Sequence, residues 1–441
     1  MALKDRLRGV RAGRGALAKR AGWGLADQAL SSLTNFALVV VVAHESAPKA
    51  FGLFALVFAT YSIALGCCRA VCSEPLAVRF SHVSQTTWRE GAALATGGAV
   101  AAGVLAGAVC VAIGLIAGGG AQGLFVILGV SLPGLLLQDT WRYAFFADRQ
   151  GVRAFANDAL YALILLPAVV GLILAGHGDT EALLAAWGGA ASLSALFGIG
   201  QARLLPQPLR ASSWWRRQAD LAPRYLAEYI AVTGDSQLVL YGVAALTSLG
   251  AVAALRGGLL LLGPLNILVF GAMLSAVPEV VRLIRRAPHR LIPASGLIAG
   301  GLAALTLLWG GFLLALPSSL GRSIIGPVWD DARPVILPLA IGGAGLGLVV
   351  GAVIGLRALA AVRRSLRARL TVSPMIFASA LLGAAADGAV GAAWGLALGQ
   401  LLAATVFWYH LVRAVSEHGA ERSSAAAATI PLSMTEAAQI S

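Results

Sequence analysis

Three carboxylates lie inside stretches that are long and apolar enough to cross a bilayer. Asp27 lies near the start of the first stretch, and "RYLAEYIAVTGDSQLVLYGVAAL" contains Glu228 and Asp235. Those two are seven positions apart, about two helical turns, so they share a helix face. Ionisable residues inside membranes usually face a bundle interior or a wet cavity and mark transport paths. We therefore predict cavity carboxylates that couple transport to H⁺ or Na⁺, with static pairing to arginine as the alternative.

Arginines also occur inside the apolar stretches. Arg69 lies near the inner end of the second stretch, and Arg256 lies in the outer third of the eighth. Such side chains pair with acids or extend to the membrane interface. Arg142 follows Asp139 by three residues, which predicts a structural ion pair along one helix face. Asp158 is interpreted as a residue at a helix start.

Composition places these residues in a polytopic membrane protein. Hydrophobic residues make up 58% of the 441 residues and charged residues only 12%, whereas soluble domains are about one quarter charged. The 53 glycines predict tightly packed transmembrane helices, because small residues let helices approach closely. The four cysteines all lie in apolar runs and provide neither a disulfide framework nor a metal site.

About twelve apolar spans of roughly 20 residues can be drawn. Almost all of the 33 Lys and Arg residues then fall in segments on one side; the opposite side holds only Lys49, Arg322 and Arg333. This asymmetry predicts a plasma-membrane protein with both termini in the cytoplasm. The spans are approximately 21–43, 51–73, 91–117, 123–145, 155–175, 182–201, 222–245, 251–281, 291–316, 334–356, 370–386 and 388–412.

Similar motifs recur in the two halves of the chain. "LAD" at 25–27 corresponds to "LAE" at 226–228, and "SEPLAVRF" corresponds to "AVPEVVRL". The expected fold is an all-α membrane protein with two six-helix pseudo-repeat lobes around a central cavity. The predicted parts are a basic cytoplasmic N-terminus (1–20), an N-terminal lobe (21–210), a C-terminal lobe (211–415) and a disordered cytoplasmic tail (416–441).

Several segments resemble the polysaccharide-type flippases of the multidrug/oligosaccharidyl-lipid/polysaccharide exporter superfamily. They are "LADQALSSLTNF", "FGLFALVFATYSIALG", "LPGLLLQDTWRYAFFADRQGVRAFANDAL" and "ALRGGLLLLGPLNILVFGAMLSAVPE". The resemblance implies a V-shaped pair of lobes that moves a polyprenyl-pyrophosphate-linked oligosaccharide from the inner to the outer leaflet. The peptidoglycan-precursor flippase of the superfamily usually has fourteen helices, which disfavours that specific role for a chain with twelve.

Such a substrate needs cations for its pyrophosphate and hydrogen-bonding groups for its sugars. Arginine suits phosphate through its bidentate fork, so Arg256 and Arg69 are the candidate phosphate contacts. Asn35 and Gln237 are candidate sugar contacts, or alternatively hydrogen-bond between helices. Gly263-Pro264 interrupts the backbone ladder of the eighth span, which predicts a kink that is either static or bends during gating.

Other functions fit less well. A cation-coupled drug or metabolite antiporter of the same superfamily is the main alternative, although only 7% of the residues are aromatic. An enzyme is disfavoured because no large outer loop carries catalytic groups. No cofactor, metal or nucleic acid is expected. The expected partners are the lipid-linked glycan, anionic lipids attracted by the basic segments, H⁺ or Na⁺, and glycan-assembly enzymes.

Overall fold

The computed structural model describes residues 2–230 and 235–428, and helices are the only regular elements in these ranges. Nine helices in them are long and apolar enough to span a membrane, and two shorter apolar helices follow Asp235. The helices are α1 (Ala2–Glu45), α2 (Pro48–Cys68), α3 (Glu74–Arg79), α4 (Gln85–Ala117), α5 (Gly119–Ala147), α6 (Gly151–Leu174), α7 (Thr180–Ala202), α8 (Ala211–Arg217), α9 (Ala222–Tyr229), α10 (Asp235–Leu246), α11 (Leu249–Leu261), α12 (Gly263–Arg286), α13 (Leu291–Ala315), α14 (Ser318–Ile325), α15 (Val328–Ala358) and α16 (Val362–Ala428).

The count of twelve spans remains a prediction, because several of the predicted spans do not appear as single helices within the described residues. The seventh, 222–245, contains both α9 and α10. The eighth is divided into α11 and α12 at Leu262. The eleventh and twelfth are joined in α16, where Asp387 and Gly388 have non-helical backbone angles. A Cβ on Gly383 would lie 2.0 Å from the Gly391 carbonyl oxygen. The chain therefore reverses at the position where the sequence predicts a break.

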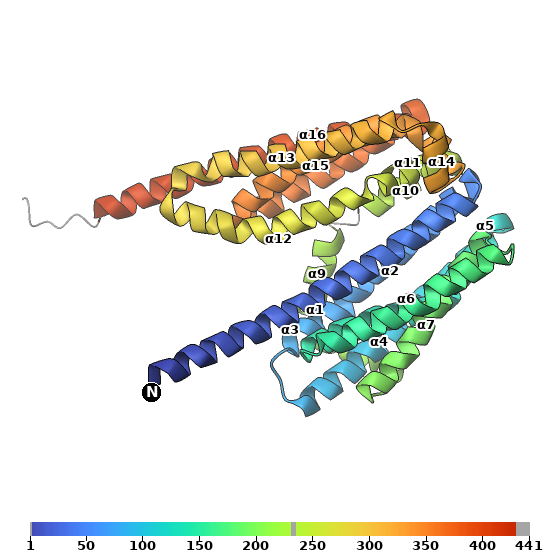
Figure 1. Ribbon diagram of the computed structural model, residues 1–441, viewed down its shortest axis with the longest axis horizontal. Coiled ribbons are helices and arrows are strands. Elements are labelled where there is room, and N and C mark those ends of the chain that lie inside the picture. The colour runs from blue at the N-terminus through green and yellow to red at the C-terminus, as the bar shows by residue number, and fades with distance from the viewer. Residues whose placement is uncertain (1, 231–234, 429–441) are drawn as a thin grey trace, which may run out of the picture. The chain divides into compact units, whose positions relative to one another are not determined.

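The chain forms two compact units. Unit 1 consists of 1–260 with 317–333, and unit 2 consists of 261–316 with 334–441. In Figure 1, unit 1 contains the blue-to-green helices α1–α7, and α12, α13, α15 and α16 belong to unit 2. The predicted lobes, 21–210 and 211–415, follow the sequence repeat and remain a prediction.

Prolines lie at or near the points where the chain passes from one unit to the other. Leu316 is followed by Pro317, and Arg333 is followed by Pro334 inside α15. The first crossing, after Leu260, precedes Gly263-Pro264, at the start of α12. Proline removes a backbone hydrogen bond and disturbs the preceding helical turn. One crossing therefore lies between two helices, at Leu316–Pro317, one lies in the last turn of α11, and one lies at a proline inside α15.

Glycines bring the helices of unit 1 into close contact. A Cβ on Gly107 of α4 would lie 2.3 Å from the Gly129 carbonyl oxygen of α5, and one on Gly103 would lie 2.6 Å from the Pro133 Cα. Only glycine allows helix backbones to approach so closely. This confirms the close packing predicted from the glycine content, and it fixes α5, which carries the central residues of the site.

Candidate functional site

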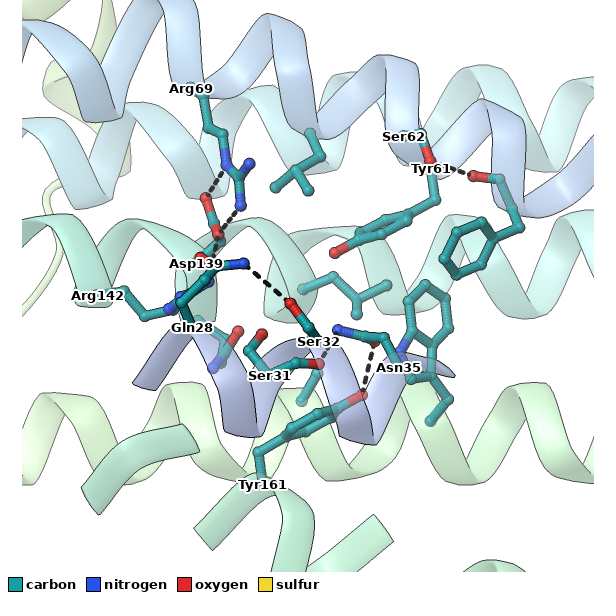
Figure 2. Close-up of a pocket in the computed structure, with 16 residues that line it drawn as sticks. Gln28, Ser31, Ser32, Asn35, Tyr61, Ser62, Arg69, Asp139, Arg142 and Tyr161 are labelled. Atoms are coloured by element: carbon teal, nitrogen blue, oxygen red, sulfur yellow. Dashed lines mark hydrogen bonds and ion pairs between the residues drawn. The ribbon is translucent and has the colours of Figure 1, made fainter. Parts of the chain in front are cut away.

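Unit 1 encloses a polar cavity of about 350 Å³ within its membrane-spanning helices. Side chains from α1, α2, α5, α6 and α7 line it, and Figure 2 shows their arrangement. Polar groups inside a bilayer are costly and usually mark a transport path or binding site. The lining residues are Gln28, Ser31, Ser32, Asn35, Phe58, Tyr61, Ser62, Leu65, Arg69, Leu135, Gln138, Asp139, Arg142, Tyr161, Trp187 and Ala191.

One face of α1 supplies hydroxyl and amide groups to the cavity. Gln28, Ser31, Ser32 and Asn35 follow the three- and four-residue spacing that places side chains on one helix face. The Gln28 amide donates to the Ser32 hydroxyl at 3.0 Å, and the Asn35 amide donates to the Ser31 carbonyl at 2.9 Å. Tyr161 donates to the Asn35 Oδ1 at 3.4 Å, as Figure 2 shows.

A π-helical turn, Arg69–Ser73, interrupts the second span after α2 and positions Arg69. Such turns occur frequently at functional sites. The Arg69 guanidinium donates to both carboxylate oxygens of Asp139, from Nε at 2.8 Å and from Nη2 at 2.6 Å. This bidentate geometry is the strongest form of an arginine–carboxylate pair, and Figure 2 shows it beside the cavity.

Arg142 is the centre of a larger ionic network. Its Nη2 and Nε donate to Asp27 Oδ2 at 2.8 Å and 3.1 Å. Its Nε also lies 3.1 Å from Asp158 Oδ2, and its Nη1 lies 3.6 Å from Asp139 Oδ1. Gln138 donates to the other oxygen of Asp158 at 2.7 Å. Helices α1, α5 and α6 are therefore joined through one guanidinium.

The network contains more negative than positive charge. Three carboxylates (Asp27, Asp139 and Asp158) face two guanidinium groups (Arg69 and Arg142), so the fully ionised cluster has a formal excess of one negative charge. The Asp27 side chain is 0% exposed and that of Asp158 is 1% exposed. Asp27 Oδ1 has no hydrogen-bond partner, and Asp158 Oδ2 has only its ion-pair contact with Arg142 Nε. Buried charge without a counter-charge is strongly unfavourable, so this arrangement suits the uptake of a proton or a small cation.

Three aromatic residues of the cavity lining, Phe58, Tyr61 and Trp187, form a group that we call the aromatic wall. The Tyr61 and Trp187 rings meet edge to face with their centroids 4.7 Å apart, and the Phe58 ring lies 5.8 Å from Trp187. The Arg256 guanidinium lies over the Phe58 ring, with its Cζ 5.3 Å from the ring centroid. Arg256 Nε is buried without a hydrogen-bond partner, and Arg256 has no ion pair within the described ranges.

The structure brings together five of the predicted site residues: Asp27, Asn35, Arg69, Asp139 and Arg142. The predicted contact between Asp139 and Arg142 is present, but it is the longest in the network. Arg69 is the closest partner of Asp139, and Asp27 is the closest partner of Arg142. The sequence spacing identified two members of the network without revealing their closest partners.

Other predicted residues lie outside the cavity lining. Glu228 is exposed at the end of α9, and Gln237 donates to Ser236 at 3.3 Å in α10. Asp235 begins α10, but its side chain lies outside the described residues. Gly263 and Pro264 begin α12, directly after the interruption at Leu262.

Sequence reasoning misinterpreted one acid and overlooked the aromatic residues of the cavity lining. Asp158 is not at a helix start: it lies within α6, is buried, and joins the Arg142 network. Its burial could not be read from its position near the predicted inner boundary. Tyr61, Tyr161 and Trp187 lie in ordinary apolar runs, where aromatic residues also serve as packing. Within the described ranges, no group of His, Cys, Asp and Glu residues is arranged to hold a metal.

The comparisons show a known transporter fold. No family model matches the chain, and no curated protein matches its sequence. A solved structure of the lipid II flippase MurJ in an inward closed conformation is similar, with a TM-score of 0.65, 10% identity, and coverage of 89% of this chain and 88% of that one.

MATE transporters are also similar in structure. An inward-facing multidrug resistance MATE family transporter of the MOP superfamily has a TM-score of 0.63 and 12% identity, over 88% of this chain and 95% of that one. The MATE transporter ClbM in complex with Rb⁺ has a TM-score of 0.50 and 13% identity, over 91% and 97%. The chain thus has the fold of this superfamily of transporters and exporters, and these neighbours are not enzymes.

Proposed function

We propose that this protein is a multi-pass plasma-membrane flippase with twelve spans and cytoplasmic termini. It moves a polyprenyl-pyrophosphate-linked oligosaccharide from the inner to the outer leaflet by alternating access. The observation that carries the proposal is Arg256, an intramembrane arginine that has no carboxylate partner within the described ranges and lies over a cavity-wall ring. A buried guanidinium needs an anion, and a pyrophosphate supplies one.

Each part of the substrate has a proposed contact. Arg256 binds the pyrophosphate. Arg69, whose side chain is 34% exposed although it holds Asp139, is the second phosphate contact. Asn35 binds sugar from the cavity, and Gln237 of α10 binds sugar beyond it. The polyprenyl chain stays in the lipid, so the protein avoids the cost of enclosing it.

The proposed movement uses the interruptions between the units. The kink at Gly263-Pro264 lies just after the first crossing, and Pro334 lies at the third. A backbone that lacks hydrogen bonds at these positions bends at lower cost than an intact helix. This supports the hypothesis that the Gly263-Pro264 kink bends during gating.

A second candidate is a cation-coupled drug or metabolite antiporter. The excess negative charge around Arg142 favours it, as does the likeness to MATE transporters. The same excess serves the flippase if Asp27, Glu228 or Asp235 couples flipping to H⁺ or Na⁺. Anionic lipids at the basic cytoplasmic segments and glycan-assembly enzymes are the further proposed partners.

The deciding experiment uses lipids from cells that lack the protein. We expect polyprenyl-pyrophosphate oligosaccharides to accumulate facing the cytoplasm, and wild type but not Arg256→Gln to reverse this. Arg282→Gln is the matched control, because Arg282 is exposed and pairs with Glu279. If no such lipid accumulates and the cells become sensitive to cationic drugs, the antiporter is correct and the flippase is not.

A further inference from the structure

We infer that the cavity of unit 1 receives the sugar attached directly to the pyrophosphate, and that it selects against sugars bearing a carboxylate. Neutral and amino sugars are the class that it accepts. The inference rests on the proposed function and adds to it, since flipping alone does not require the protein to distinguish sugars. Four features of the cavity carry it: its charge, its wall, its position beside Arg256 and its size.

The charge of the lining disfavours anions. Both cavity arginines are already engaged: Arg69 by both oxygens of Asp139, and Arg142 by Asp27 and Asp158. The exposed part of Arg69 is assigned to the pyrophosphate, so no guanidinium remains for a carboxylate on the sugar, and the formal excess of the cluster is negative. A carboxylate brought into the cavity meets like charge in a medium of low dielectric constant, where repulsion is strong.

The cavity walls suit a sugar ring. The lining combines the hydroxyls and amides of α1, which donate and accept hydrogen bonds, with the Tyr61 and Trp187 rings. Sugars combine hydroxyl groups with apolar C–H faces, so they need both kinds of wall. Figure 2 shows Ser31, Ser32, Asn35 and Tyr161 gathered on one side of the cavity.

The position of Phe58 identifies which sugar would enter. Its ring lines the cavity and also lies beneath the Arg256 guanidinium at 5.3 Å. A pyrophosphate held by Arg256 therefore lies one aromatic ring from the cavity, and the sugar bonded to it is the unit within reach. The cavity volume of about 350 Å³ is near the lower end of ligand pockets, about 300–1,000 Å³. It therefore suits a single sugar ring better than an oligosaccharide.

The test measures binding to purified full-length protein in phosphatidylcholine nanodiscs. The ligands are three polyprenyl pyrophosphates: one without sugar, one with a single N-acetylhexosamine and one with a single hexuronic acid. We expect the N-acetylhexosamine compound to bind at least tenfold more tightly than the hexuronic acid compound. Asn35→Ala should weaken binding of the N-acetylhexosamine compound about five- to tenfold. Its affinity for the sugar-free compound should stay within twofold of the wild-type value. Ser192→Ala, also within unit 1 but outside the lining, should change neither.

A gain of function tests the charge argument directly. Gln28 is exposed and lines the cavity, so Gln28→Lys adds a positive charge without removing a buried partner. It should tighten binding of the hexuronic acid compound at least fivefold, whereas the neutral control Gln28→Met should not. Equal binding of all three ligands by wild type, or an unchanged preference in Gln28→Lys, would overturn the inference while leaving the flippase standing. Failure of wild type to bind any of the three would overturn both.

Discussion

Removing Arg142 and removing Asp27 should have very different effects on stability, although the two side chains form one ion pair. Arg142→Met leaves Asp27 and Asp158 buried, with exposed fractions of 0% and 1%, and without their shared cation. Two unit charges about 4 Å apart attract by about 4 kcal/mol at an effective dielectric constant of about 20. Breaking a buried pair from one side typically costs about 3–5 kcal/mol. We therefore expect Arg142→Met to lower the free energy of unfolding by about 3–5 kcal/mol.

Asp27→Asn should lower the free energy of unfolding by only about 1 kcal/mol or less. The substitution removes the attraction to Arg142, but it also removes the excess negative charge and its repulsion with Asp139 and Asp158. Arg142 keeps Asp158 at 3.1 Å and Asp139 at 3.6 Å. The remaining cluster holds two carboxylates and two guanidinium groups, so its charges balance.

Denaturant unfolding of the purified protein in micelles measures both values, followed by the fluorescence of buried tryptophans such as Trp141 and Trp187. Arg322→Met is the control: Arg322 and Asp330 form a pair with both side chains about half exposed, and such pairs contribute about 0–1 kcal/mol. If Asp27→Asn destabilises the protein as much as Arg142→Met, Asp27 is a required counter-ion. The argument from excess charge would then be refuted.

Three further substitutions test two close backbone contacts and the kink at Gly263-Pro264. Gly107→Val should destabilise unit 1 by about 1–3 kcal/mol or more, because its Cβ would lie 2.3 Å from the Gly129 carbonyl oxygen; an unchanged midpoint of unfolding would contradict this packing. Gly326→Ala should increase proteolysis near α14, because Gly326 has a φ of +59° and a Cβ there would lie 2.3 Å from the His44 carbonyl oxygen. Protection from the protease equal to that of wild type would argue against that contact. Pro264→Ala should slow transport in reconstituted vesicles at normal substrate affinity, and a normal rate would leave the kink as a static feature.

The sequence predicts the class of fold well because the bilayer imposes few solutions. Only helices and closed barrels span lipid, and a continuous apolar run of about 20 residues indicates a helix. Glycine content also correctly predicts close helix packing, as between Gly107 and Gly129. The break near Asp387 is also correctly predicted, because a short Gly/Ala stretch there interrupts the pattern. These are local properties of the chain.

The partners within the site are not predictable in the same way, because they are set by contacts between distant residues. Asp139 and Arg142 are neighbours on one helix, so their spacing suggests a pair, yet each has a closer partner on another helix: Arg69 and Asp27. Those contacts join positions 70 and 115 residues apart in the chain. Without the packing of α2 against α5 and of α1 against α6, periodicity cannot distinguish such a partner from a side chain that extends to the interface.

The uneven charge of the network is the strongest reason to regard it as functional. A network that only joins helices would favour equal numbers of acids and arginines, since each unbalanced buried charge costs several kcal/mol. Arg256 shows the opposite imbalance in the same unit, because it is an arginine without an acid within the described ranges. The two imbalances are separate: Arg256 lies over Phe58, whereas the excess acids surround Arg142. This separation suits a ligand with an anionic group joined to a neutral ring, and it suits a mobile cation that enters as the ligand leaves.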